Sequence, residues 1–201
     1  DGSKESTNTW RVKLDQRVDV AWGEQCHEQC VLTRGAVAVG EEAVLPAQGW
    51  RFSAILPVLD ASRWEPVIED MLSGFGESAS PGTLAIAARI GDLVAAGHRF
   101  RDVSGKALRR DGNWTLRLDG PDLAGDLNWS ETGNGSLRAR LSQLSLQPVS
   151  GGFQAEPVIV TGSGRPSRQP PALDVVAEHF RLGSMDLGKL TVETSGLGDQ
   201  D

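Results

Sequence analysis

The sequence predicts an all-β fold with one short helix, built as an elongated, curved antiparallel sheet. Three observations carry this prediction. Apolar residues recur at every second position over most of the chain, which is the period of a strand with one apolar face. The 24 Gly and 10 Pro among 201 residues indicate frequent turns. Helical periodicity is confined to one stretch near residues 62–72.

The alternation is longest near the N-terminus, from Trp10 to Trp22. Its apolar positions include four aliphatic side chains, Val12, Leu14, Val18 and Val20. Charged residues stand between them, so we expect one long strand or two shorter ones with an apolar and a charged face. Residues 1–9 are polar and are expected to be a frayed, disordered end. The same alternation returns from Trp50 to Val58.

A helix is predicted next, because Ser62 and Glu65 have the spacing of a capping box. Five apolar residues then fall on one helical face: Trp64, Val67, Ile68, Met71 and Leu72. Such a face needs a partner, so we expect the helix to cover part of the sheet. Residues 10–76 therefore form a β segment with one amphipathic helix, and residues 77–82 form a linker.

Residues 83–160 are predicted to be a β-meander. Asp111-Gly112 and Asn134-Gly135 are turn signals between alternating runs. The apolar positions of these runs include Leu84, Ile86, Leu116, Leu118, Leu127, Leu137 and Leu141. The alternation changes phase after Leu141, which predicts a β-bulge near Ser142-Gln143. Residues 161–171 are a predicted loop.

A faint internal repeat relates two parts of the chain at a spacing of 89 residues. Leu84, Ile86 and Ala88 correspond to Leu173, Val175 and Ala177. We therefore expect residues 172–201 to begin a further β-repeat that is cut short. The chain also does not begin with Met. Together these observations suggest a fragment of a longer protein.

The composition excludes several classes of function. The formal net charge is −7, which argues against nucleic acid and against an anionic membrane surface as the direct partner. No apolar run approaches the roughly 20 residues that span a bilayer, so no transmembrane segment is expected.

The two cysteines, Cys26 and Cys30, are the one constellation with chemical promise. Across a tight three-residue turn they would face each other, and in an oxidising compartment a disulfide would close a hairpin tip. Two free thiols are the first alternative. A metal site using Cys26, His27 and Cys30 is the second, although structural zinc requires four ligands.

No catalytic motif stands out, so the chain is predicted not to be an enzyme and to use no cofactor or metal. The carboxylates are scattered, and neither His98 nor His179 has a Ser or Cys nucleophile motif nearby in the sequence. Five tryptophans lie at or near strand ends: Trp10, Trp22, Trp50, Trp114 and Trp129. They could be sugar-stacking platforms, or they could close the ends of apolar strips.

Several phrases in the second half of the chain form a recognisable series. They are NWTLRL at 113–118, PDLAGDLNW at 121–129, GSLRARL at 135–141, PALDV at 171–175, FRLG at 180–183 and LGKL at 187–190. RGAVAVG at 34–40 and LPVLD at 56–60 fit as well. This series resembles the YhdP type of AsmA-like bacterial envelope proteins, most closely over residues 84–195.

The resemblance implies a periplasmic segment of a very long protein that is anchored in the inner membrane. It implies a taco-like sheet whose apolar groove shields phospholipid acyl chains between the inner and outer membranes. The expected partners are those acyl chains and neighbouring segments of the same long chain. The groove candidates are Val12, Leu14, Val18, Val20, Leu84, Ile86, Leu116, Leu118, Leu127, Leu137, Leu141, Leu173 and Val175. A structural envelope scaffold without a lipid groove, or a glycan-binding β-protein, remains the alternative.

Overall fold

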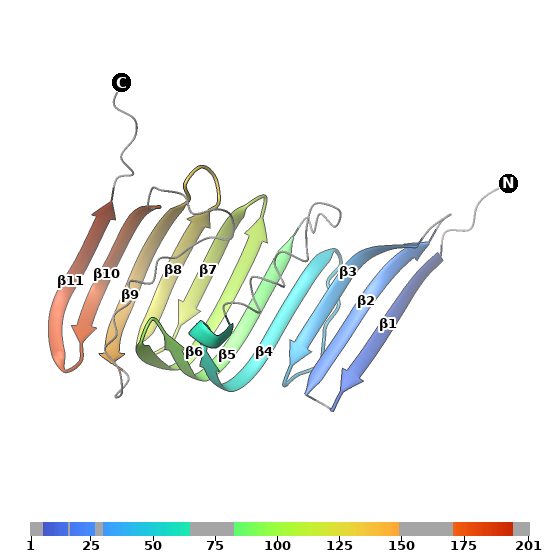
Figure 1. Ribbon diagram of the computed structural model, residues 1–201, viewed down its shortest axis with the longest axis horizontal. Helices are drawn as coiled ribbons and strands as arrows, with labels where there is room; N and C mark the ends of the chain where they lie inside the picture. The colour runs from blue at the N-terminus through green and yellow to red at the C-terminus, as the bar shows by residue number, and fades with distance from the viewer. Residues whose placement is uncertain (1–5, 16, 27–29, 65–82, 149–170, 195–201) are drawn as a thin grey trace, which may run out of the picture.

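The computed structural model describes residues 6–15, 17–26, 30–64, 83–148 and 171–194, and these form one sheet of eleven strands in chain order (Figure 1). The strands are β1 (Ser6–Leu14), β2 (Val18–Cys26), β3 (Cys30–Val39), β4 (Gly49–Asp60), β5 (Leu84–Ala95), β6 (His98–Arg110), β7 (Asn113–Asp119), β8 (Leu123–Ser130), β9 (Ser136–Pro148), β10 (Ala172–Leu182) and β11 (Met185–Thr194). Figure 1 shows them side by side as one curved layer. The prediction of an all-β fold is confirmed.

Three neighbouring pairs are parallel, β3–β4, β4–β5 and β9–β10, and the others are antiparallel, so the sheet is mixed and not antiparallel throughout as the sequence predicts. A parallel pair needs a connection that crosses over a face of the sheet. The crossover between β3 and β4, residues 40–48, is described. Most of the other two connections, residues 65–82 and 149–170, lies outside the described residues.

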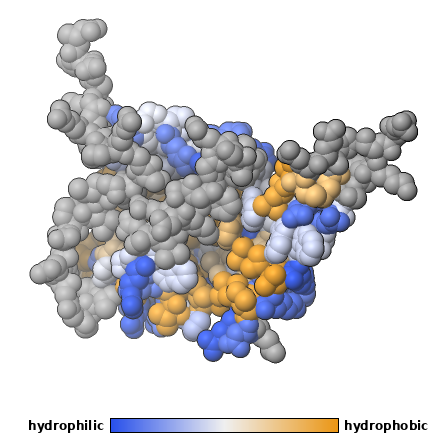
Figure 2. Space-filling model, turned by 45° about the vertical axis from the view of Figure 1, so that its right-hand side comes forward, coloured by the Kyte–Doolittle hydropathy of each residue, from blue (hydrophilic) through white to orange (hydrophobic). Residues whose placement is uncertain are grey.

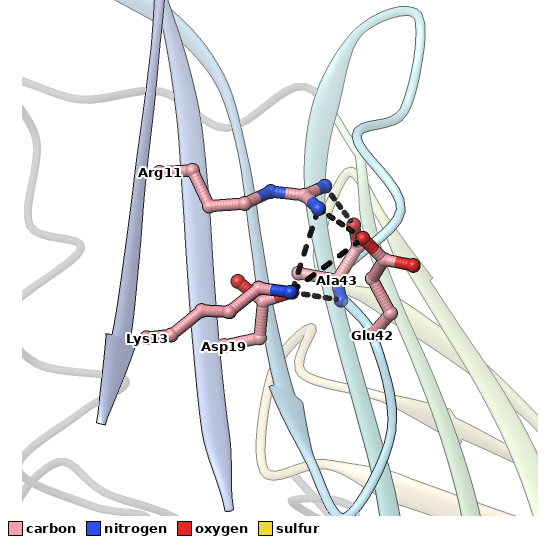
Figure 3. Close-up of polar contacts among 5 residues, drawn as sticks. All are labelled: Arg11, Lys13, Asp19, Glu42 and Ala43. Atoms are coloured by element: carbon pink, nitrogen blue, oxygen red, sulfur yellow. Dashed lines mark hydrogen bonds and ion pairs between the residues drawn. The ribbon is translucent and has the colours of Figure 1, made fainter. Parts of the chain in front are cut away.

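The β3–β4 crossover is fastened to one face of the sheet by a cluster of charged groups (Figure 3). The Ala43 amide donates to Asp19 Oδ2 at 3.0 Å, and Arg11 donates to the Ala43 carbonyl at 2.8 Å. Arg11 also pairs with Glu42 and lies 3.7 Å from Asp19. These contacts bury Ala43 against Ala21, Ala36 and Ala38. The crossover therefore covers the charged face of β2 and β3.

Two boundaries differ from those that the sequence predicts. Strand β1 begins at Ser6, because residues 6–9 pair with β2 in register. The predicted disordered end is therefore wrong for residues 6–9, and residues 1–5 lie outside the described residues. The long alternating run is a hairpin of β1 and β2 that turns at Asp15, whose φ is 47°. Strands β4 and β5 pair directly on either side of the predicted linker, so the two predicted segments share one sheet.

Other local predictions are confirmed. Asp111 and Gly112 both have positive φ, 51° and 72°, as a two-residue hairpin turn requires. The register between β8 and β9 shifts at Ala124/Gly125, so that Ser142 is the extra residue of a bulge. Residues 61–64 are helical, and the rest of the predicted helix lies outside the described residues.

Candidate functional surface

The register of the sheet brings the apolar residues of all eleven strands onto one face in continuous rows. The central row contains one residue from each strand: Val12, Val20, Val37, Phe52, Ile86, Ala107, Leu116, Leu127, Ala139, Val175 and Val192. Side chains that are directly opposite each other point to the same face. The central row is therefore an unbroken apolar strip across the whole described sheet.

A second apolar row, here called the lower row, lies next to the central row on the same face. In each strand its residue is two positions from the central-row residue. It contains Leu14, Val18, Val39, Ala54, Ala88, Gly105, Leu118, Gly125, Leu141, Ala177 and Leu190. It carries no polar side chain. In the middle of the sheet the apolar surface continues past this row with Leu56, Ile90 and Val103, which are register partners.

On the other side of the central row is a third row, the tryptophan row. It contains Trp10, Trp22, Gly35, Trp50, Leu84, Arg109, Trp114, Trp129, Leu137, Leu173 and Thr194. Five of the six Trp residues of the chain are in this row. The three rows together define the apolar face.

All of the groove candidates from the sequence lie on the apolar face, and the register distributes them among its rows. Val12, Val20, Ile86, Leu116, Leu127 and Val175 are in the central row. Leu14, Val18, Leu118 and Leu141 are in the lower row, and Leu84, Leu137 and Leu173 are in the tryptophan row. The groove candidates did not include Val37, Phe52 and Val192, which the parallel and terminal pairings bring into the same strip.

The apolar face is a single layer within the described part of the chain. Strands there make substantial contacts only with their neighbours in the sheet, apart from β6 with β9, so no second sheet of described residues packs on the face. At the β1 end its side chains are exposed: Trp10 by 51%, Val12 by 43% and Leu14 by 57%. Figure 2 shows hydrophobic surface that adjoins hydrophilic surface on this side of the molecule.

Part of the face is a true core rather than an open surface. Ala139, Leu141 and Ala177 are buried, and Leu123, Leu144 and Phe180 pack against them. Leu84 is also buried. Leu141 and Leu84 therefore stabilise the sheet, whereas Val12, Leu14 and Leu116 are the better contacts for an external ligand.

The opposite face is charged. Along β7 the side chains of Asn113, Thr115, Arg117 and Asp119 are exposed, while those of Trp114, Leu116 and Leu118 are half-buried. Between β9 and β10, Arg138 and Arg140 both reach Asp174, at 2.9 and 2.7 Å. The hydrogen bond from Arg140 is the main reason that the pKa of Asp174 is lowered.

A hollow of about 920 Å³ lies over this charged face, beside the β3–β4 crossover. Its lining mixes Arg51, Lys106 and Arg117 with Glu41, Glu42 and Asp126. Both signs of charge are present in equal number, and no nucleophile–base pair is among the lining residues. The hollow therefore has no evident catalytic arrangement.

Cys26 and Cys30 are register partners at the tip of the β2–β3 hairpin and are joined by a disulfide. Glu24 lies close to both sulfur atoms. Because each sulfur is bonded to the other, neither is a thiolate that could bind a metal. His27 lies outside the described residues. Among those residues, no helix has the length and apolar character that a bilayer crossing requires.

Comparison with known proteins gives one match. A family model described as "YhdP protein" matches residues 1–200 of the chain. No curated protein and no solved structure matches it significantly.

Proposed function

The chain belongs to the YhdP family of AsmA-like cell-envelope proteins, and we propose that it is a periplasmic segment whose apolar face shields phospholipid acyl chains during transport between the inner and outer membranes. The single observation that carries this proposal is the central row, which is apolar on all eleven strands.

The physical reason is the cost of exposing hydrocarbon to water. Each methylene group removed from water is worth about 0.8 kcal/mol, so a chain of sixteen carbons is held by many small, non-directional contacts. Such contacts are equivalent along an unbroken strip, which lets a chain move sideways without a large barrier. The mechanism requires no nucleophile, proton transfer or metal.

Two features of the sheet suit this role. The described crossover packs on the charged face of β2 and β3 and not on their apolar face. The strands follow each other in chain order, so neighbouring segments of a longer chain would extend the same rows at β1 and β11. An exposed apolar patch of this extent usually marks a binding surface.

Mass spectrometry of material extracted from the purified chain tests the proposal. We expect phospholipid to co-purify at a defined ratio. Extraction of saccharide without lipid would support a glycan-binding protein that uses its tryptophans. Extraction of neither, from a folded chain offered phosphatidylethanolamine in detergent micelles, would leave the scaffold as the remaining function.

A further inference from the structure

The two margins of the apolar face differ chemically. Beyond the tryptophan row most of the next residues are polar: Asn8 in β1, Glu24 in β2, Gln48 just before β4 and Glu131 just after β8, with Leu32 of β3, the register partner of Glu24, as an apolar exception. Beyond the lower row it stays apolar over β4–β6, with Leu56, Ile90 and Val103, and over β8–β10, with Leu123, Leu144 and Phe180. Over these strands the face is therefore amphipathic along the strand direction.

Three indole rings of the tryptophan row point their N–H groups toward the polar margin. Trp10 and Trp22 both donate their indole N–H to Glu24, each at 3.2 Å. Trp114 donates to Glu131 at 3.0 Å. Both carboxylates belong to the polar margin. In these three residues the polar tip of the ring is held at that margin, and the apolar body remains beside the central row.

Members of the row also pack against one another at three pairs of neighbouring strands. Trp10 and Trp22 stack with their ring centroids 6.4 Å apart. The ring of Trp50 lies over Gly35, where a methyl group would come within 2.2 Å of it. The Arg109 guanidinium lies 5.9 Å from the ring centre of Trp114 and pairs with Glu131 at 2.9 Å.

We propose that the tryptophan row is the head-group edge of the lipid-binding face, so that each bound phospholipid lies with its glycerol region at this row and its acyl chains along the strands. The inference rests on the proposed function and deepens it by assigning the orientation of the lipid. Tryptophan has this role in membrane proteins, where amphipathic rings collect at the boundary between hydrocarbon and water.

The dimensions agree with this orientation. From the tryptophan row to the lower row is four residues, roughly 13 Å at 3.3 Å per residue. The row of Leu56, Ile90 and Val103 extends the apolar depth to about 20 Å in the middle of the sheet. One leaflet of a bilayer has a hydrocarbon depth of about 15 Å, half of the full core. In the middle of the sheet the face is thus deep enough for acyl chains that start at the tryptophan row.

The tryptophans themselves can report the orientation. Trp64 is the one Trp of the chain outside the row and is 47% exposed, so Trp64→Phe leaves a folded chain whose emission comes from the row alone. This variant is loaded with phosphatidylcholine that carries a nitroxide either on the fifth acyl carbon or near the terminal methyl. Gel filtration then removes vesicles and micelles, and phosphate analysis counts the lipid that remains bound.

We expect a larger loss of emission from the nitroxide near the glycerol than from the one near the chain end, at equal bound lipid. Equal losses, or a larger loss from the chain end, would overturn the assigned orientation while leaving the lipid-binding function intact. Absence of bound phosphate would instead contradict the proposed function itself. Unlabelled phosphatidylcholine at the same loading controls for changes in emission that lipid binding alone causes.

Discussion

The indole ring of Trp50 on β4 lies across Gly35, its register partner on β3. A Cβ atom at position 35 would approach the ring at 2.2 Å, closer than any real contact. Because Gly35 has no side chain, it leaves a space in the tryptophan row, and the Trp50 ring occupies that space.

Gly35→Ala should therefore destabilise the sheet by about 1–3 kcal/mol, the usual cost of overpacking, as measured by urea unfolding. Gly105→Ala is the matched control, because its new methyl would meet only the end of the flexible Leu118 side chain at 3.2 Å. Adding Trp50→Leu to Gly35→Ala should recover part of the loss. If the two glycine variants are equally stable, the ring does not occupy the gap.

A charge in the central row should prevent lipid binding without unfolding the chain. Leu116 is half-buried in the middle of that row, so Leu116→Asp places a carboxylate where acyl chains are proposed to lie. Bound phospholipid, counted as phosphate, should fall strongly. Thr115→Asp adds the same charge on the opposite face and should bind lipid normally.

In the longer protein of which this chain is proposed to be a segment, Leu116→Asp should also impair outer-membrane integrity at a normal protein level. Leu141→Asp is a poor probe, because Leu141 is buried in the core cluster and a charge there would unfold the sheet. Full function in Leu116→Asp and in similar variants at Val12 and Leu127 would favour the scaffold.

Asp19 should be important for stability, since it is 5% exposed and holds the β3–β4 crossover through the Ala43 amide. Asp19→Ala leaves that amide and Arg11 without the carboxylate, so a loss of about 3 kcal/mol or more is expected in urea unfolding. Asp15→Asn, at an exposed position in the neighbouring turn, is the control, because asparagine tolerates the positive φ of that residue. Similar stability of the two variants would show that the crossover is held by other contacts.

The Cys26–Cys30 disulfide should be complete in protein from an oxidising compartment. Thiol titration of unreduced, unfolded chain should find no free thiol. The double variant Cys26→Ser/Cys30→Ser should lose about 2 kcal/mol, the entropy that closing so short a loop removes from the unfolded chain. Two free thiols per chain would contradict both the bridge and the periplasmic assignment.

Glu131 should titrate below its ordinary pKa of 4.5. Burial alone would raise the pKa, but hydrogen bonds from Arg109 and Trp114 outweigh burial and lower it. The stabilisation is therefore present above the unfolded pKa and is lost as the pH falls through the folded pKa. Carboxyl chemical shifts in NMR give the midpoint directly. Arg109→Gln should move it upward, and an unchanged midpoint would remove Arg109 as a cause.

The prediction from sequence was strongest where the structure is local. Alternation places Leu116 and Leu118 on one face of β7 and Thr115 on the other, because the side-chain period of a strand is two residues. The Asp111-Gly112 turn and the bulge at Ser142 were predictable for the same reason, since each depends on a few adjacent residues.

The internal repeat with a spacing of 89 residues could also be found in the sequence, and the structure shows where its two copies lie. Leu84 and Leu173 lie in the tryptophan row, Ile86 and Val175 in the central row, and Ala88 and Ala177 in the lower row. Each copy begins a hairpin after a parallel pairing. Equivalent sequence positions thus occupy equivalent depths on the apolar face.

Only the tertiary structure decided how the strands are aligned with one another. A period of two residues specifies the face of each side chain within its own strand, but it leaves the offset between strands open. That offset depends on hydrogen bonds between distant segments, above all at the parallel pairs β3–β4 and β9–β10. The register between strands therefore brings together tryptophans as far apart in the sequence as Trp10 and Trp129, which are separated by 119 residues. The difference between the two margins of the apolar face likewise arises only when that register is set.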